Sequence, residues 1–371
     1  MPSRRPSRLG TRLAVLPRAA LQLLATAGRR RPPTCPHRIL VAHHLLLGDT
    51  LMLTPLLAKL RAQHRDAEIA MTVPRAIAPL FAGRPYGVEA LTYDPYDRMM
   101  LGPLTGGRSF DLAIVPGDNR QSWLAAAIGA RWIVAFGGDR PAYKSWPVDD
   151  LRPYPDRPAA WGDIVSTLVD GPAPPPYDPA DWPDPPARPF DAPRGDYCVL
   201  HVGASTPLKQ WEPDKWRTLA ERLAARGLQV VWSGGRGEEG AVRAIDRERQ
   251  FPSFAGALDL QQLWFLLKHA VLLVAPDTGV AHLGRIVNVP TVTLFGPGSR
   301  VICGAGEFWR NAPYRAVTIE HFPCRDQRVL FKREIEWVRH CTRSTRECSA
   351  PRCMHALEFD AVEMAVDALL R

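Results

Sequence analysis

A proline-rich stretch divides the chain into two halves of similar pattern. Ten prolines lie between Pro172 and Pro193, a density that leaves no room for a regular helix or strand. On either side of it, strand-like apolar runs alternate with helical segments, which predicts mostly parallel sheets covered by helices on both faces. The sequence therefore predicts an α/β protein in which two Rossmann-like domains face each other across a cleft.

The sequence sets four expected segments along the chain. Residues 1–37 form a basic N-terminal arm, and residues 38–170 form a first Rossmann-like domain with the strands RILVAHHLLL, AEIAMTV and FDLAIVPG. Residues 171–194 are the proline-rich linker, and residues 195–371 form a second Rossmann-like domain with a cysteine-rich C-terminal segment. Ligands of such sheets bind at the carboxyl ends of the strands, so we expect the functional residues in the loops that follow strands.

The positive charge of the chain belongs to its N-terminal arm. The formal net charge is +9, and residues 1–38 contain nine arginines and no acidic residue. The remaining 38 basic residues (47 minus nine) balance the 38 acidic residues, so the body lacks the basic surface typical of nucleic-acid binding. Leucines fall near one face of a helix in the arm, and no run reaches the roughly 20 apolar residues that span a bilayer. We expect either a basic amphipathic segment on an anionic membrane surface or a disordered, solubilising arm.

The most informative stretch of the second half is VLLVAPDTGVAHL, residues 271–283. A strand ends at Asp277 and a helix begins at Thr278 and Gly279, where the free backbone amides of the first turn favour a phosphate. His282 lies in the same turn and can donate to a phosphate oxygen. The alternative is structural: Asp277 or Thr278 caps the helix and His282 packs in the core.

Two further loops of the second half follow strands and carry polar side chains suited to a nucleotide. GASTPLKQW places Ser205, Thr206 and Lys209 before a helix, and SGGRGEEG places Glu238 and Glu239 after paired glycines. Hydroxyls and an ammonium suit phosphates, and an acid after a strand can accept hydrogen bonds from ribose hydroxyls. Because parallel strands end at one edge of a sheet, the three loops together predict a nucleotide-diphosphate site. Taken alone, Lys209 is typical of a solvated surface lysine.

These motifs, with GDTLMLTPLLAKLR near the start and NVPTVTLFGP after the helix, resemble glycosyltransferase family 9, the lipopolysaccharide heptosyltransferases and their relatives. The resemblance runs from about residue 38 to residue 300. It implies the GT-B fold, with the acceptor bound by the first domain and the nucleotide-sugar by the second. It also implies inverting, metal-independent transfer, typically of a heptose from ADP-heptose, onto a lipid-linked oligosaccharide such as the lipopolysaccharide core. No cofactor is then required, and the expected location is cytoplasmic, peripheral on the inner face of the inner membrane.

The resemblance further implies roles for individual residues. Asp49 matches the family's proposed general base, Lys209 the phosphate-binding lysine and Glu238 a ribose-contacting acid. The donor-sugar and pyrophosphate loop corresponds to Asp277, Thr278, Gly279 and His282. Two places depart from the family's pattern. Gly284–Arg285 puts a bulky cation near the donor loop, and His43–His44 precede the LLLGD motif.

Asp49 is the first acidic residue of the chain and follows Gly48 at the start of a predicted helix. As general base it would take the proton of the acceptor hydroxyl while that hydroxyl attacks the anomeric carbon. Gly48 would allow a tight turn and leave room for the sugar, and we place Gly48 and His44 on the acceptor side of the site. The alternative is that Asp49 is a plain helix N-cap, which asparagine would replace almost without loss.

Four cysteines near the C-terminus are spaced as C-x16-C-x6-C-x4-C, namely Cys324, Cys341, Cys348 and Cys353. Such a cluster is typical of a structural zinc site or of paired disulfides, and free, partly buried thiols are the third possibility. A nucleotide-sugar is a cytosolic metabolite, so a reducing compartment disfavours disulfides. The stretch LFKREIEWVRH between the cysteines is typical of a solvated helix face, with an anionic acceptor or the membrane as alternative partners.

Two other functions fit the same architecture. A non-hydrolysing UDP-sugar 2-epimerase would turn over without any acceptor. A catalytically silent nucleotide-sugar-binding protein at the membrane would bind nucleotide whether or not Asp49 is intact. A dehydrogenase is disfavoured, because neither half carries a G-x-G-x-x-G fingerprint after a strand.

Overall fold

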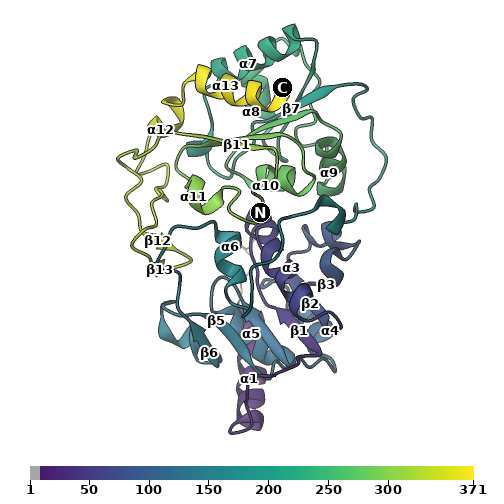
Figure 1. Cartoon of the computed structure of the whole chain (residues 1–371), viewed down its shortest axis with the longest axis vertical. Coiled ribbons are helices and arrows are strands. Elements are labelled where there is room, and N and C mark those ends of the chain that lie inside the picture. The colour runs from purple at the N-terminus through teal and green to yellow at the C-terminus, as the bar shows by residue number, and fades with distance from the viewer. Residues whose placement is uncertain (1–8) are drawn as a thin grey trace, which may run out of the picture.

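The computed structural model describes residues 9–371, which form two α/β domains, one above the other in Figure 1. The first domain contains a six-stranded parallel sheet in the order β3-β2-β1-β4-β5-β6. Its strands are β1 (Arg38–Val41), β2 (Glu68–Val73), β3 (Val88–Thr92), β4 (Leu112–Val115), β5 (Ile133–Phe136) and β6 (Asp150–Arg152). Its helices are α2 (Leu47–Leu51), α3 (Thr54–Gln63), α4 (Leu101–Thr105), α5 (Gln121–Ile128) and α6 (Trp161–Ser166).

The second domain repeats this plan with a five-stranded parallel sheet in the order β11-β10-β9-β7-β8. Its strands are β7 (Tyr197–His201), β8 (Gln229–Ser233), β9 (Leu272–Pro276), β10 (Thr291–Phe295) and β11 (Tyr314–Thr318). Its helices are α7 (Pro213–Ala225), α8 (Glu239–Ile245), α9 (Leu260–Lys268), α10 (Gly279–Ile286), α11 (Arg300–Cys303), α12 (Arg352–His355) and α13 (Phe359–Leu370). Two parallel sheets with helices confirm the predicted α/β class.

Each sheet reverses its order of growth beside its first strand, between β1 and β4 in one domain and between β7 and β9 in the other. Loops that leave the strands on either side of such a point diverge and open a crevice at the carboxyl edge of the sheet. Side chains of β1 alternate between the two faces of its sheet, as its pleat requires. Ile39 and Val41 join an apolar core that continues across the domain boundary, whereas Leu40 and Ala42 join a separate core on the outer face.

The proline-rich segment 171–194 is extended, as predicted, but it packs closely on both domains. Apart from a short 3-10 helix (Pro179–Asp181) it has no regular structure. The Tyr177 hydroxyl donates to the Ile286 carbonyl at 2.7 Å, and the Trp182 indole donates to the Leu80 carbonyl at 3.1 Å. Both rings are buried, so the segment fastens the two domains together on one side of the molecule.

The N-terminal arm contains a helix, α1 (Leu9–Thr26), while residues 1–8 lie outside the described part of the chain. The helix packs on α5 through a face of small residues, of which Thr11, Val15 and Ala19 are buried. Its leucine face points to solvent, with Leu13 64% exposed and Leu24 74% exposed. Of residues 9–371, no helix is both long and apolar enough to cross a bilayer.

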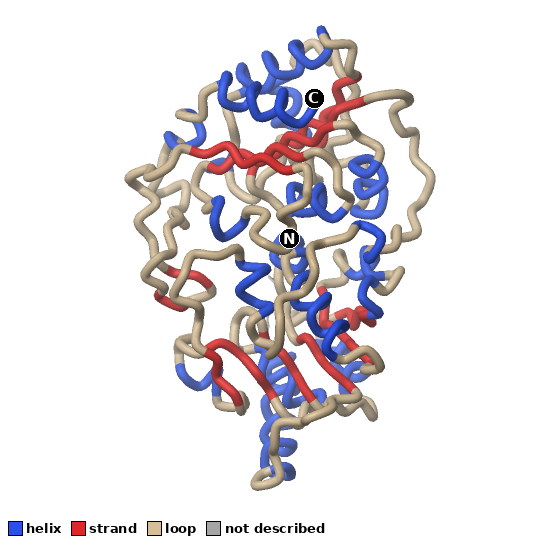
Figure 2. The backbone as a smooth tube through the Cα atoms, viewed as in Figure 1, coloured by secondary structure: helices blue, strands red, loops and turns tan. Residues whose placement is uncertain are grey.

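A second crossing between the domains is made by residues 319–351, which we call the C-terminal strap. It leaves the second domain after β11, returns to the first domain, and carries a hairpin of β12 (Val329–Leu330) and β13 (Arg333–Glu334). It runs on the side of the molecule opposite to the proline-rich segment, mostly as loop (Figures 1 and 2). The expected boundary, which put all of residues 195–371 in the second domain, therefore missed this return. The helix predicted for LFKREIEWVRH is wrong, because the stretch folds as a hairpin.

Candidate functional site

A cavity of about 500 Å³ lies between the two domains at the carboxyl edges of their sheets. Its wall on the first domain is the start of α2, from Leu46 to Asp49. The loops after β7, β8 and β9 form the opposite wall. The predicted site residues on the cavity wall are Gly48, Asp49, Ser205, Lys209, Glu238, Asp277, Thr278, Gly279 and His282. The three loops of the second domain thus meet at one sheet edge, although they lie far apart in the sequence.

Lys209 and Asp277 form the charged centre of this cavity. The Lys209 ammonium donates to the Asp277 carboxylate at 3.1 Å and to the Asp277 carbonyl at 2.6 Å. Burial disfavours the charged lysine, but Asp277 and Asp49 beside it hold its pKa above the ordinary value. Lys209 is therefore a permanently charged, ordered cation inside the cavity and not a solvated surface lysine.

Asp49 occupies the third position of α2, whose N-cap residue is Leu46 and has no side-chain cap. No group within residues 9–371 donates a hydrogen bond to its carboxylate. Burial raises the pKa of Asp49 to about 6, the nearby Asp277 adds to the rise, and Lys209 opposes it. The N-cap alternative is wrong for this geometry. The carboxylate is instead free to accept a proton near neutral pH.

The start of α2 touches the start of α10 directly across the domain boundary. A Cβ atom on Gly48 would lie 2.8 Å from the His282 ring, and one on Gly279 would lie 3.0 Å from the Leu47 side chain. Gly48 therefore makes room for the His282 ring and also lines the first cavity, and the predicted room for a sugar beside it stays a prediction. The two glycines let the helices approach closely and bring Asp49 next to the donor loop.

Arg285 fixes the protonation state of His282. Its guanidinium contacts the His282 Nδ1 atom and donates to the Gly304 and Cys303 carbonyls, the latter at 3.0 Å. Arg285 also lies over the Trp309 ring at 5.1 Å. Because a guanidinium only donates hydrogen bonds, Nδ1 must accept, and the remaining proton of a neutral imidazole sits on Nε2. Burial, aided by the charges of Arg285 and Lys209, lowers the pKa of His282 well below its usual range.

Glu238 joins two of the cavity loops. Its carboxylate accepts hydrogen bonds from the Ala204 amide at 2.8 Å and the Gly235 amide at 2.5 Å. A side chain on Gly203 would collide with this carboxylate. Glu238 is thus held at the cavity wall by backbone amides, and the ribose contact expected of it stays a prediction. Ser205, on the same loop as Gly203, is exposed at the cavity mouth.

Part of the cavity wall is apolar, which the sequence did not reveal. It consists of Phe254, Leu258, Leu260 and Leu263, which we call the apolar slot. His201 and Ser233 line the same cavity, with the His201 Nδ1 atom and the Ser233 hydroxyl 3.1 Å apart. Burial lowers the pKa of His201 to about 4, so it is neutral. His201 and Ser233 are the last residues of β7 and β8. Their place at the carboxyl ends of predicted strands is the signal by which the sequence could have identified them.

A second cavity of about 470 Å³ meets the first at four shared residues, Asp49, Lys209, Asp277 and Cys303. Thr206 lies in this second cavity, where its side chain caps a 3-10 helix (Pro207–Lys209). The C-terminal strap supplies one of its walls through Leu330, Phe331, His340, Cys341, Thr342, Arg343 and Ser344. Asp49 and Lys209 therefore line both cavities, at the boundary between them.

Some predicted residues lie elsewhere. His44 makes an edge contact with the Tyr93 ring, with centroids 5.9 Å apart, and lines a cavity beside α1 instead of the Asp49 site.

The hydroxyl of Thr278 is buried without a hydrogen-bond partner within residues 9–371. It occupies the N-cap position of α10 but does not cap the helix through its side chain.

Of the three possibilities for the cysteine cluster, the structure matches free thiols. All seven cysteines are free thiols, and the described part of the chain contains no group of three or more metal-ligating side chains. Cys341 faces the second cavity, Cys353 is buried in the second domain beside Gly296, and the Cys348 thiol donates to the Ala350 carbonyl at 3.1 Å. The strap is held by arginines instead, such as Arg325, whose guanidinium donates to the Gly296 and Phe295 carbonyls of the second domain.

Comparisons with known proteins place the chain in a family. Lipopolysaccharide heptosyltransferase 1 of Pseudomonas aeruginosa is 32% identical over 157 residues, 38% of this chain and 43% of that protein. The chain spans about two-fifths of the length of the curated relatives it matches. Among solved structures, the E. coli ADP-heptose lipopolysaccharide heptosyltransferase II aligns with a TM-score of 0.66 at 18% identity, over 90% of this chain and 98% of that chain. E. coli heptosyltransferase WaaC with ADP aligns with a TM-score of 0.60 at 18% identity, over 75% and 92%.

The structural neighbours show that the two facing domains form the GT-B fold. The family model for glycosyltransferase family 9 (heptosyltransferase) matches residues 106–330, which is more than half of the chain. That interval contains the whole second-domain wall of the first cavity, from His201 to Cys303. The chain belongs to glycosyltransferase family 9, the heptosyltransferases.

Proposed function

We propose that the protein is an inverting, metal-independent glycosyltransferase that moves a heptose from ADP-heptose onto a lipopolysaccharide core or a related glycan. The observation that carries the proposal is the position of Asp49, a carboxylate with a pKa near 6 at the junction of two cavities. A transferase needs separate places for donor and acceptor and one base between them. An enzyme that acts on the donor sugar alone has no use for the second cavity.

The first cavity suits a nucleoside diphosphate. The apolar slot at Phe254 and Leu263 accepts a flat base, and Glu238 stands where ribose hydroxyls would follow. The free amides at the start of α10 and the Lys209 ammonium converge on the position of the pyrophosphate. The heptosyltransferase WaaC, which shares the fold, was solved with ADP, and this supports adenine as the base.

The proposed reaction is a single displacement. The acceptor hydroxyl enters from the second cavity and loses its proton to Asp49 while its oxygen bonds to the anomeric carbon. The bond from that carbon to the diphosphate breaks on the opposite face, so the configuration inverts and ADP leaves. Lys209, the α10 amides and the Nε2 proton of His282 stabilise the departing charge, which is the task a metal ion performs in other transferases.

The lipid-linked acceptor brings the protein to a membrane surface, and α1 supports peripheral binding there. Its exposed leucines, among them Leu13 and Leu24, face away from the body, and Arg12 and Arg18 lie beside them on the exposed surface. A helix with this distribution lies in the interface of an anionic membrane, with the apolar face toward the acyl chains.

The donor assignment is tested by thermal unfolding with ADP, UDP, GDP and CMP. A ligand at about 100 times its dissociation constant adds roughly 2.7 kcal/mol to the free energy of unfolding. We expect the melting temperature to rise with ADP, and Lys209→Ala to weaken this rise. Lys268→Ala, on the far side of α9 in an ion pair with Asp184, is the matched control and should leave the rise unchanged. A rise with UDP alone would contradict the ADP assignment and favour the epimerase.

A further inference from the structure

We infer that the C-terminal strap is the acceptor-binding wall of the second cavity, and that Phe331 at its hairpin tip contacts a carbohydrate ring of the acceptor and determines acceptor specificity. The inference rests on the proposed transferase function and deepens it. Most of this wall lies beyond residue 330, where the match to the family model ends.

The position of the second cavity separates its ligand from the nucleotide. It shares Asp49, Lys209, Asp277 and Cys303 with the first cavity but none of the residues of the apolar slot. With the nucleoside in the slot, the transferred sugar reaches the shared residues, and the space beyond them is left for the acceptor. In the second cavity this space lies between the second domain, Trp161 of α6 and the strap.

The hairpin tip has a strained backbone conformation. Phe331 and Lys332 form the two-residue turn between β12 and β13, with φ angles of +46° and +62°. Such turns favour glycine or asparagine, because a side chain in the left-handed region is strained. A bulky aromatic residue in this position persists only when its surroundings hold it there, and such strain concentrates at functional sites. The turn directs Phe331 into the cavity wall, where its ring lies 4.7 Å from the Trp161 ring.

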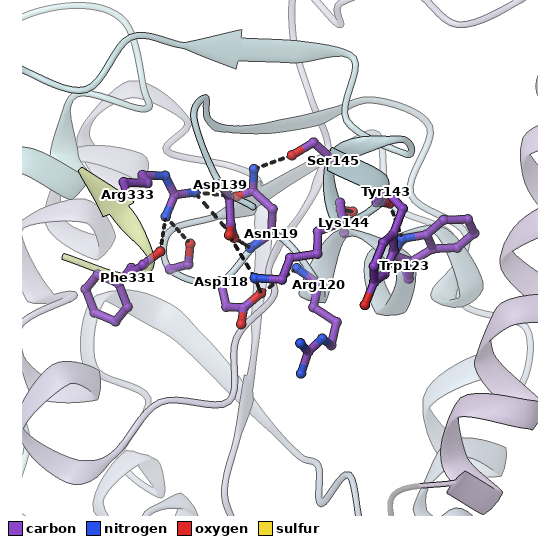
Figure 3. Close-up of polar contacts among 12 residues, drawn as sticks. Asp118, Asn119, Arg120, Trp123, Asp139, Tyr143, Lys144, Ser145, Phe331 and Arg333 are labelled. Atoms are coloured by element: carbon purple, nitrogen blue, oxygen red, sulfur yellow. Dashed lines mark hydrogen bonds and ion pairs between the residues drawn. The ribbon is translucent and has the colours of Figure 1, made fainter. Parts of the chain in front are cut away.

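Arg333 is the side chain that holds the strained tip in place. It points from β13 into the loops that follow β4 and β5 (Figure 3). Its guanidinium donates to the Gly137 carbonyl at 2.8 Å, the Gly117 carbonyl at 3.0 Å and the Asn119 side chain at 2.7 Å. Arg333 is almost fully buried. It therefore anchors the hairpin to the carboxyl edge of the first sheet, at a position two residues after Phe331.

The chemistry of the wall fits a neutral, hydroxyl-rich ring better than an anion. Phe331 and Trp161 offer aromatic surface, and Ser299 and Thr206 offer hydroxyls to the same cavity. The strap's cation in this wall, Arg343, is already paired with Asp326 at 2.8 Å. Apolar walls with a few placed polar groups orient a bound ring, so the expected ligand is a sugar unit of the acceptor glycan.

The test compares Phe331→Ala with Lys332→Gly in transfer from ADP-heptose to heptose-free lipopolysaccharide core oligosaccharide. Phe331→Ala should raise the KM for the oligosaccharide about tenfold, the loss typical of an aromatic binding contact. Its KM for ADP-heptose and its melting shift with ADP should match those of the unmodified protein. Lys332→Gly removes backbone strain from the turn without changing a side chain of the cavity wall. It should leave the KM for the oligosaccharide, the KM for ADP-heptose and the melting shift with ADP unchanged. A higher KM for ADP-heptose, or an unchanged KM for the oligosaccharide, would overturn the inference.

A labelling experiment tests the same wall without catalysis. Cys341 lines the second cavity, while Cys348 lies on the same strap outside it. The core oligosaccharide should slow alkylation of Cys341 by N-ethylmaleimide at least tenfold relative to Cys348, and ADP alone should not. Equal rates with and without oligosaccharide would overturn the inference. Failure of the unmodified protein to transfer sugar at all would instead contradict the proposed function.

Discussion

The two cavities that meet at Asp49 are built in different ways. The first is formed mainly by loops that follow consecutive strands of one sheet, and most of its polar residues belong to the motifs of the family. The second is assembled from α6, the second domain and a strap that returns from the C-terminal end of the chain. The difference is that one cavity follows from the topology of a single sheet, whereas the other depends on contacts between segments far apart in the sequence.

The largest expected effect concerns the carboxylate shared by both cavities. General base catalysis contributes roughly 10²–10⁴-fold, so Asp49→Asn should lower kcat by that factor. The melting shift with ADP should persist, because asparagine keeps the size of the side chain and the donor cavity keeps its other residues. The measurement is the transfer rate at saturating substrates, paired with the ADP melting shift on the same sample. Loss of both would show that Asp49 is needed for the fold of the donor cavity and not for proton removal.

Substitution of Arg285 tests the role of His282 in the first cavity. Replacing it with leucine removes the donor that forces His282 to present its Nε2 proton. A hydrogen bond to a charged group is worth about 1.5–3 kcal/mol, so kcat should fall roughly 10- to 100-fold. Since the leaving charge develops only in the transition state, the KM for ADP-heptose should change little. Arg285→Lys retains a donor and should recover part of kcat.

An equal rise in KM and fall in kcat for Arg285→Leu would point to general damage of the cavity. The melting temperature of both variants serves as the control for folding.

The pH dependence reports on Asp49 in the free enzyme. Its carboxylate must be deprotonated to act as base, and its pKa is about 6. The value of kcat/KM should therefore be constant above pH 7 and fall about tenfold per pH unit below 6. Lys209 stays charged and His282 stays neutral over this range, because their pKa values are shifted upward and downward respectively. A limb centred near pH 4 would show that Asp49 is not buried as described.

The smallest effect on chemistry is expected for α1. Leu13→Ser combined with Leu24→Ser should reduce sedimentation of the protein with anionic lipid vesicles, because both side chains belong to the exposed apolar face. Transfer to a water-soluble oligosaccharide should be unchanged. Val15 faces α5, so Val15→Ser is the contrasting variant that should lower the melting temperature instead. Unaltered vesicle binding of the double variant would contradict a membrane role for α1.

The residues that line the first cavity could be predicted from the sequence, because their signals are local. A strand that ends at Asp277, a glycine at position 279 and a histidine one turn later define the anion loop without knowledge of distant residues. The parallel sheets follow from alternating strands and helices in the same local way. The strand order reverses beside β1 and beside β7, and the loops at the carboxyl ends of the strands converge at these two places.

The second cavity could not be predicted, because contacts between distant segments determine it. The stretch LFKREIEWVRH is rich in good helix formers, and no glycine or asparagine marks the turn at Phe331 and Lys332. The hairpin forms because Arg333 finds acceptors near residues 117–137, about 200 positions earlier in the chain. The role of Arg285 could not be predicted for the same reason. Its charge was apparent in the sequence, but its partners at Cys303 and Gly304 were not.

The most direct test of two separate cavities is product inhibition by ADP in steady-state transfer from ADP-heptose to core oligosaccharide. On the proposed assignment ADP occupies the first cavity, so it should compete with ADP-heptose, and at a fixed, non-saturating concentration of ADP-heptose added oligosaccharide should not overcome the inhibition. Competition of ADP with the oligosaccharide would contradict the account, because it would place both ligands in one cavity. Conversion of the donor sugar without any oligosaccharide present would contradict it as well.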